Sequence, residues 1–265
     1  MFALDAATQL QRTAEGEYLV RGELAYWNFN SAFGGWAMAV AQAAVREAGG
    51  PDGALISLTA VFPDALKAKD LLVRAAPLRE KAKTVFWRVS FTHASEHDGP
   101  TVFSADLIVT QRRKTQSTFA APMPVAPPFA DCPIFDASLG PKWMQHYEQR
   151  GIEGQPLTVQ EHPRNRVWFV ERDGRPWDEK GLVAISDAFM PRIFFIDATP
   201  RFGATVSFGL HLFAQADDYA SAGNAPLLLE GDADAIGDGL YDQRGKLWSG
   251  DGRLLAVSNQ VALYR

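Results

Sequence analysis

The apolar positions in the first half of the chain predict one buried helix followed by four strands. Residues 36–50 (WAMAVAQAAVREAGG) are rich in alanine, lack a run of β-branched residues and end in two glycines, which is typical of a helix. Apolar side chains lie on nearly every side of this stretch until Arg46, so the helix should be buried. A strand and turn at 18–30 precede it. The strands predicted after it are 55–62, 70–79, 84–93 and 101–112.

The second half repeats this order of elements at a nearly constant offset. A short strand at 166–171 precedes an apolar stretch at 181–195 (GLVAISDAFMPRIFF). A short apolar run by itself fits either a strand or a helix, but its place in the repeat favours a helix. The strands predicted after it are 205–213, 226–234, 239–249 and 253–264.

A proline-rich segment separates the two halves. Residues 120–141 contain six prolines, which argues against a central strand and for a linker. We therefore expect an N-terminal unit at 1–118, a linker at 119–160 and a C-terminal unit at 161–265. A helix followed by a meander of strands, twice, predicts an α+β fold in which each curved antiparallel sheet wraps one helix. This arrangement is a double hot-dog.

Composition and charge narrow the class of protein. The 265 residues are 47% hydrophobic and 22% charged, which fits a globular protein with a sizeable core. The net charge of -5 argues against a nucleic-acid-binding protein. The single cysteine, Cys132, rules out an internal disulfide and favours the cytoplasm. No stretch has the pattern of a signal peptide or a membrane span, so we expect no membrane partner.

Four short motifs resemble the bacterial acyl-CoA thioesterase II family. They are Phe33-Gly34-Gly35, Ser186-Asp187, Ala204-Thr205-Val206 and the C-terminal segment 252–265, in which Gln260 stands five residues before an arginine. Members of that family are double hot-dogs, and their active-site aspartate, threonine and glutamine fall on Asp187, Thr205 and Gln260. The chain departs from the family at 62–65, where an Arg-Pro is usual, and at 225–226, where a tryptophan is usual.

Asp187 is also the residue that the hydrophobic pattern singles out. It lies within an apolar run, where a carboxylate is costly to bury unless it is hydrogen-bonded or paired. Burial would raise its pKa, and such a carboxylate can act as a general base on water. Pro191 lacks an N–H, so the predicted helix should kink or end there. The alternative is a structural aspartate bonded to a neighbouring strand.

Thr205 and Gln260 have the groups needed to hold a water molecule against that base. A hydroxyl and a carboxamide each donate and accept hydrogen bonds. Strand alternation predicts that Thr205 and Ser207 share one face, opposite Phe208. The alternative for Thr205 and Ser207 is a solvated strand face. Counting back along the repeat places Val40, Thr59 and Ile108 at the positions of Asp187, Thr205 and Gln260, so we expect one catalytic centre per chain.

Other candidate residues concern the substrate. Phe33, Gly34, Gly35 and Ser207 are expected to contact it. Gly35 or Gly181 could bring backbone N–H groups to a thioester carbonyl, and the alternative is that both glycines simply form turns. The five histidines show no metal-ligand spacing, and we expect neither metal nor cofactor. Residues 112–114 (RRK) are either a CoA-phosphate contact or a solvated charge run. The aromatic residues considered as walls of an acyl tunnel or as ordinary core are Phe29, Phe33, Trp36, Phe189, Phe194 and Phe195.

Three functions remain open from the sequence. The first is hydrolysis of acyl-CoA to a free acid and CoA by water that Asp187 activates. The second is a hot-dog hydratase or dehydratase acting on an enoyl or 3-hydroxyacyl thioester; in one common motif of these enzymes a histidine follows the aspartate by five residues, where this chain has Arg192. The third is a binding module for acyl thioesters without catalysis. Sheet edges also favour pairing between copies, so we expect a homodimer or larger assembly.

Overall fold

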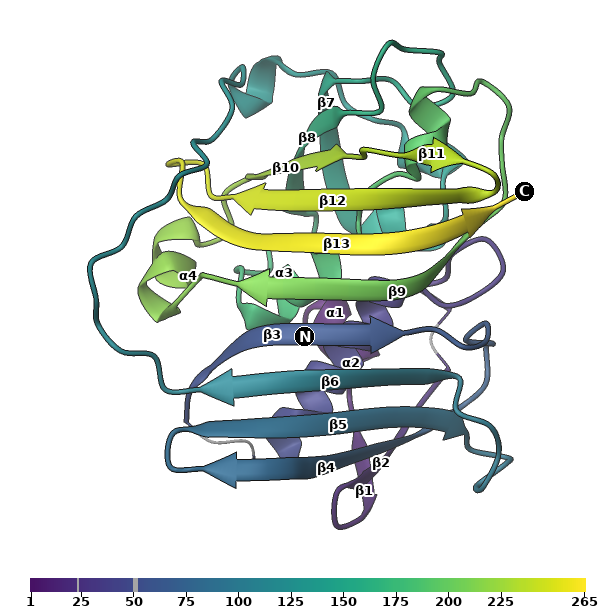
Figure 1. Cartoon of the computed structure of the whole chain (residues 1–265), viewed down its shortest axis with the longest axis vertical. Coiled ribbons are helices and arrows are strands. Elements are labelled where there is room, and N and C mark those ends of the chain that lie inside the picture. Colours follow the sequence, from purple (N-terminus) through teal and green to yellow (C-terminus); the bar gives the residue numbers. More distant parts are fainter. Residues whose placement is uncertain (23, 50–51) are drawn as a thin grey trace.

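A single antiparallel sheet runs through both halves of the protein. The computed structural model describes residues 1–22, 24–49 and 52–265, and its described strands form one sheet of 13 strands. At its centre, β3 (Ala54–Val61) of the first half pairs with β9 (Gly203–Leu212) of the second. Figure 1 shows the sheet curving in front of the two central helices. The predicted α+β double hot-dog is therefore confirmed, with the two sheets fused edge to edge.

The first half follows the predicted order. Helix α2 (Gly34–Glu47) is followed by four strands, and the buried residues along its length confirm a core helix. The expected glycine stop is met at Gly49, whose φ is +87°, while Gly50 lies outside the described residues. The further elements of this half are α1 (Ala3–Ala7), β1 (Gln11–Ala14), β2 (Glu17–Val20), β4 (Leu71–Lys81), β5 (Thr84–His93) and β6 (Phe103–Thr110). Of the region predicted as a strand and turn at 18–30, residues 18–20 lie in strand β2, which pairs with β1 and β4, and the described residues after them form turns.

The helix of the second half is shorter than predicted. Helix α3 (Glu179–Ile185) ends before Asp187, and only a 3-10 turn at Arg192–Phe195 follows, so the expectation of a helix that contains Asp187 and kinks or ends at Pro191 was wrong. Pro191 has no N–H and disfavours a helical conformation at Met190, so it would prevent a helix from continuing beyond that residue, but α3 already ends at Ile185. The further elements are β8 (Asn165–Glu171), α4 (Ala216–Ala222), β10 (Leu227–Asp232), β11 (Ile236–Gly237), β12 (Leu240–Trp248) and β13 (Leu254–Tyr264).

The segment between the halves is partly regular. It runs along one side of the molecule in Figure 1, from β6 to the far end of the second half. It contains 3-10 turns at Phe129–Asp131, Ala137–Leu139 and Lys142–His146, and then strand β7 (Tyr147–Glu153), which pairs with β8. Part of the segment expected as a linker therefore extends the sheet of the second half.

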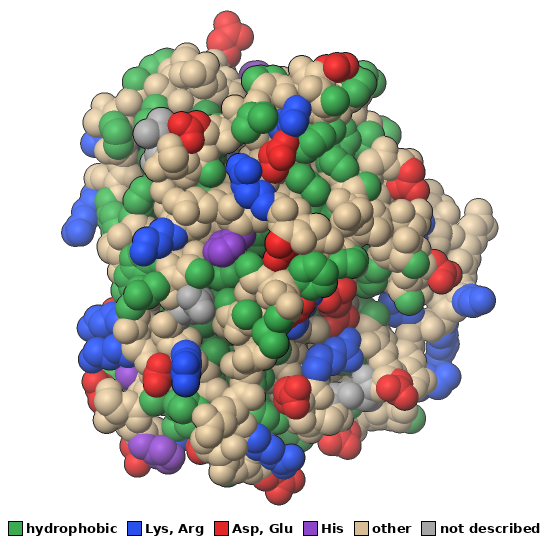
Figure 2. All heavy atoms as spheres, turned by 180° about the vertical axis from the view of Figure 1, so that it is seen from behind, with side chains coloured by type: hydrophobic (Ala, Val, Ile, Leu, Met, Phe, Trp, Pro, Cys, Tyr) green, Lys and Arg blue, Asp and Glu red, His purple; other side chains and the backbone are tan. Residues whose placement is uncertain are grey.

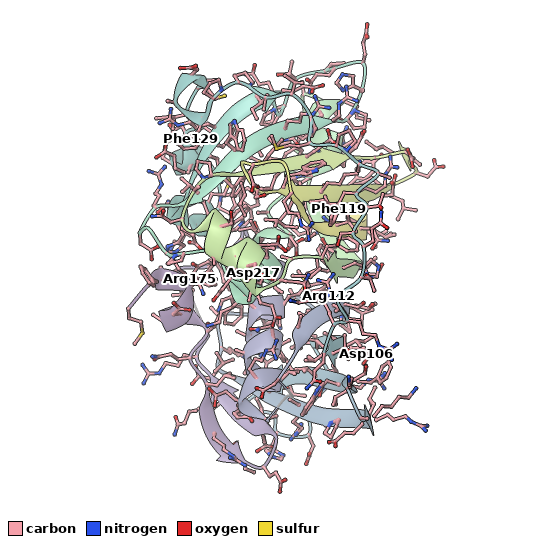
Figure 3. The ribbon with its side chains drawn as sticks, turned by 90° about the vertical axis from the view of Figure 1, so that its left-hand side faces the viewer. Asp106, Arg112, Phe119, Phe129, Arg175 and Asp217 are labelled. Carbon is pink, nitrogen blue, oxygen red and sulfur yellow. The ribbon has the colours of Figure 1, made fainter. Side chains whose placement is uncertain are left out.

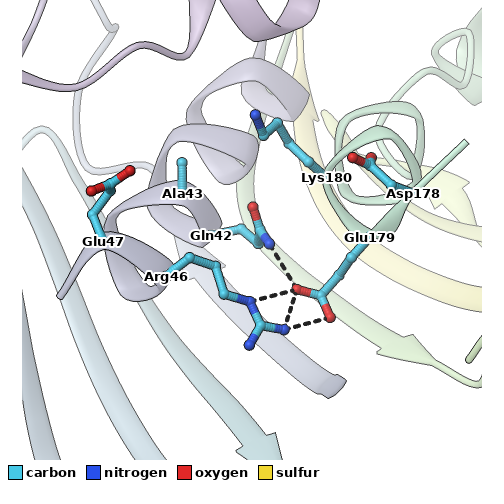
Figure 4. A pocket seen from close by; sticks show the side chains of 7 residues that line it. All are labelled: Gln42, Ala43, Arg46, Glu47, Asp178, Glu179 and Lys180. Atoms are coloured by element: carbon cyan, nitrogen blue, oxygen red, sulfur yellow. Dashed lines mark hydrogen bonds and ion pairs between the residues drawn. The ribbon is translucent and has the colours of Figure 1, made fainter. Parts of the chain in front are cut away.

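The two central helices cross at very close range. A Cβ atom placed on Gly35 of α2 would lie 2.1 Å from the carbonyl oxygen of Ala184 in α3, so only glycine fits there. At the other end of this helix pair, Glu179 of α3 accepts hydrogen bonds from Gln42 and Arg46 of α2. Figure 4 shows this ion pair in a small hollow between the helices. The helix pair is therefore fixed at both ends.

Candidate active site

Asp187 lies in a short loop between α3 and the following 3-10 turn. The carbonyl of Ser186, just before it, accepts a hydrogen bond of 3.1 Å from the hydroxyl of Ser258 in β13. The carbonyl of Met190, three residues after it, accepts one of 3.0 Å from Nε of Arg192. Both donors are buried. The sheet and the 3-10 turn thus hold the loop that carries the carboxyl, although the residue itself is outside any helix.

The carboxyl of Asp187 meets the N-terminus of α2. A Cβ atom on Gly34 would lie 2.6 Å from Oδ2, and the backbone N–H of Gly35 donates a hydrogen bond to the carboxylate. Desolvation dominates its electrostatics and raises the pKa of Asp187 to about 7, while the Gly35 hydrogen bond lowers it in part. At neutral pH the group is thus able to take up or release a proton. The Phe-Gly-Gly motif explains this contact, because larger residues would displace the carboxyl.

Thr205 and Gln260 are joined across β9 and β13. The hydroxyl of Thr205 donates a hydrogen bond of 2.7 Å to Oε1 of Gln260. A β-bulge at Val206 places Thr205 opposite Ala262, on the inward face, and leaves Ser207 opposite Val261, which is 37% exposed. The expectation that Thr205 and Ser207 share a face was therefore wrong, because the extra residue breaks the alternation of side chains.

A cavity of about 1690 Å³ brings these residues together. Asp187, Thr205, Gln260 and Gly34 all line it. Ligand pockets usually measure roughly 300–1,000 Å³, so this space exceeds what a small metabolite needs. Ser207 and Phe33 are not among the described residues that line the cavity. Phe33 instead supports the wall from behind, stacked on Trp143 with ring centroids 4.3 Å apart.

Several other predicted residues have different places. The N–H of Gly181 donates to Oδ1 of Asp178 within the α3 cap, at 2.8 Å, so it does not face a substrate. Arg112 donates to the carbonyls of Phe213 and Ala214, at 2.5 and 3.3 Å, away from the residues that line the cavity. Figure 3 shows it at the boundary between the halves. Of the aromatic candidates, those that line the cavity are Phe29, Phe189 and Phe194.

Sequence reasoning missed two cavity residues on β12. Tyr241 and Gln243 both line the cavity from the inward face, and Gln243 stands directly opposite Gln260 in the strand register. The detectable signal was a polar residue at an inward position of an otherwise alternating strand, between Tyr241 and Gly245.

Charges are mixed over the molecular surface. On the face seen in Figure 2, acidic and basic side chains are interspersed. The described residues contain no group of three or more His, Cys, Asp or Glu side chains that could hold a metal ion. None of the helices in the described part of the chain is long and apolar enough to cross a bilayer.

Comparison with known proteins places the chain in a family. Family models described as the acyl-CoA thioesterase N-terminal domain and C-terminal domain match residues 24–110 and 120–264. The chain therefore belongs to the acyl-CoA thioesterase family, and the resemblance to thioesterase II proteins is confirmed. Among curated proteins, no match to this chain was found.

Solved structures share the fold over nearly the whole chain. A conserved hot-dog protein of unknown function from Alicyclobacillus acidocaldarius is 29% identical, with a TM-score of 0.94, and the alignment covers 100% of this chain and 98% of that one. An acyl-CoA thioesterase II from Mycobacterium marinum is 20% identical, with a TM-score of 0.78 and coverage of 99% and 98%. The second likeness concerns the fold alone.

Proposed function

We propose that this protein hydrolyses acyl-CoA thioesters to a free acid and CoA, with Asp187 as the general base. The observation that carries the proposal is a carboxyl with a pKa near 7 in the same large cavity as a hydrogen-bonded threonine and glutamine. A base with a pKa close to the working pH is partly ionised and still able to accept a proton. The family to which the chain belongs supplies the substrate class.

Hydrogen-bond directions support a specific role for each of the three residues in the proposed reaction. The Thr205 hydroxyl donates to Gln260, which leaves its oxygen free to accept a hydrogen from water and leaves Nε2 of Gln260 free to donate to the water oxygen. The second water hydrogen goes to Asp187. The water oxygen then attacks the thioester carbonyl carbon, the C–S bond breaks, and the proton taken by Asp187 passes to the leaving thiolate.

The alternative of a hydratase or dehydratase needs a second acid–base group. Arg192 stands at the place of the expected histidine, and it is fully buried and bonded to neutral oxygens. No histidine is among the described residues that line the cavity. These observations favour hydrolysis, which needs one base and an oriented water.

A thiol-release assay on purified protein tests the proposal. We expect free CoA to appear from acyl-CoA substrates, and a series of chain lengths will define the acyl preference. Hydration of crotonyl-CoA without thiol release would instead establish the hydratase. Tight binding of acyl-CoA with no turnover of any substrate would establish a binding module.

The pH dependence reports the base directly. Hydrolysis requires ionised Asp187, so kcat/KM should rise with pH and level off above about 7, the pKa that burial gives this carboxyl. The control is Glu171, a second buried carboxyl outside the cavity whose pKa is raised to about 8 by burial. Glu171→Gln should leave the inflection in place. A profile that is flat from about pH 5 to 9 would contradict Asp187 as the base.

Removing the threonine hydroxyl should reduce turnover. Thr205→Val keeps the shape but loses the hydrogen bond that orients Gln260, and we expect kcat to fall by roughly 10- to 100-fold, because water is no longer held in line. The matched control is Thr59→Val at the corresponding, exposed position of the first half. Equal kcat in both variants would remove Thr205 from the mechanism.

A further inference from the structure

Two glutamine side chains lie side by side on the inward face of the sheet. Gln243 of β12 and Gln260 of β13 are paired in register, and each lines the cavity. They are 2% and 8% exposed, so both amides are almost wholly enclosed. Buried amides need defined partners, because an unsatisfied one costs about 1–3 kcal/mol. Their partners therefore show which way each amide faces.

Arg192 fixes the direction of the Gln243 amide. Nε of Arg192 donates to Oε1 of Gln243 at 2.9 Å. A guanidinium has only donors, so the glutamine oxygen must be the atom that faces it. Among the described residues, none accepts a hydrogen bond from Nε2 of Gln243. Its two N–H groups are thus left for the cavity, next to those of Gln260.

Arg192 itself occupies an unusual position. It is fully buried, and its other acceptors are the carbonyls of Met190 and Pro163 and the side-chain oxygen of Asn165, all neutral. No carboxylate among the described residues lies within ion-pair distance of it. Burial lowers its pKa to about 9, so it remains charged at neutral pH. An unpaired buried charge is costly, and here it polarises the amide that it holds.

The site lacks the oxyanion donors that the sequence predicted. Gly181 is occupied by the α3 cap, and the N–H of Gly35 donates to Asp187. Hydrolysis of a thioester places negative charge on the carbonyl oxygen, which has to be met by a donor.

We propose that Gln243 is this donor: its Nε2 group contacts the thioester carbonyl oxygen, and Arg192 is the positioning residue that keeps the amide turned toward it. The inference rests on the proposed hydrolysis for the identity of the carbonyl. The amide of Gln260 then donates a hydrogen bond to the attacking water, and the neighbouring amide of Gln243 donates one to the thioester oxygen that becomes negative.

Binding of two inert CoA derivatives tests this contact without requiring turnover. One is a ketone analogue of octanoyl-CoA with a methylene inserted between sulfur and carbonyl; the other is the thioether S-octyl-CoA, which has no carbonyl. Gln243→Glu keeps the shape and the bond to Arg192 but has no N–H to donate. We expect it to weaken the ketone analogue about tenfold, and the thioether less than about twofold.

Turnover gives the second readout. In Gln243→Glu, kcat should fall roughly 100-fold while KM changes much less, since the oxygen gains its charge only in the transition state. Gln243→Met carries no charge, so it tests whether misfolding or charge repulsion causes the effect of Gln243→Glu. It should likewise weaken binding of the ketone analogue more than binding of the thioether. Asn259→Asp, on the exposed face one residue from Gln260, is the matched control and should bind both analogues like the parent.

A double-mutant cycle separates the positioning role of Arg192 from general stability. Arg192→Lys should weaken the ketone analogue selectively in the parent, but have no selective effect once Gln243 is replaced by methionine. Equal losses for both analogues, or none, in the two Gln243 variants would overturn the inference even if the parent hydrolyses acyl-CoA. A parent without thiol release whose ketone binding depends on Gln243 would overturn the proposed hydrolysis and leave the carbonyl contact standing.

Discussion

Asp187→Asn should abolish thioester hydrolysis while the protein stays folded. Asparagine has nearly the same shape and still accepts the hydrogen bond from Gly35, but it cannot take a proton from water. Loss of a general base typically costs roughly 100- to 10,000-fold in rate. The measurement is kcat for CoA release. Asp217→Asn, on the exposed helix α4, is the matched control and should retain parental activity.

Asp187→Asn should lower activity without lowering stability at alkaline pH. Because burial raises the pKa of Asp187 from 3.8 to about 7, the fold favours the protonated carboxyl. Its contribution to stability is full below the unfolded pKa and is lost as the pH rises through about 7. At about pH 8 the parent therefore holds a costly buried charge, which the neutral asparagine side chain of the variant avoids. A variant that is inactive and no less stable at this pH supports a catalytic role, whereas an inactive and destabilised one would indicate a structural aspartate.

Gly35→Ala should strongly destabilise the protein. In an ordinary helix this change stabilises by about 0.5–1 kcal/mol. Here the new Cβ would lie 2.1 Å from the carbonyl oxygen of Ala184, so the two central helices have to move apart. Overpacking costs typically about 1–3 kcal/mol and occasionally more, and we expect a loss at the upper end because the obstacle is backbone. Chemical denaturation measures it.

Activity should fall together with stability in Gly35→Ala, since separating the helices also pulls the Gly35 N–H away from Asp187. Gly237→Ala is the control, because nothing lies within 4 Å of a Cβ at that position. A Gly35 variant as stable as the parent would show that the helix crossing adjusts freely, contrary to the close packing described above.

Much of the fold followed from local patterns. Alternation and β-branched residues predicted the strands that surround the site. The alanine-rich run predicted α2, because apolar side chains on nearly every side of a helix are typical of a buried one. The repeat correctly predicted the position of the second helix, but the predicted helix was longer than α3. Pro191 was recognised as a stop, yet the helix ends at Ile185, where side chains from distant segments already satisfy the backbone: Ser258 bonds the carbonyl of Ser186.

The candidate site was only partly predictable. Motif resemblance predicted Asp187, Thr205 and Gln260 as site residues, and all three line the cavity. It gave no orientation: the bulge at Val206 turns Thr205 inward and Ser207 outward, and bulges depend on how two strands pair. The sequence drew attention to Arg192 only because it stands where one motif of hydratases and dehydratases has a histidine. Its bond to Gln243 joins residues 51 positions apart, and no local pattern encodes such a pairing.

The sequence by itself determined that this protein has two similar α+β halves, a buried helix in the first, and a lone acidic residue in an apolar run of the second. Hydrophobic periodicity and turn residues act locally, so they can be read along the chain. Only the tertiary structure decided that Asp187 faces the N-terminus of α2 across the junction of the halves, and that burial there raises its pKa to about 7. The pKa of a carboxyl depends on which atoms surround it in space, and here some of those atoms, at Gly34 and Gly35, come from the opposite half of the chain.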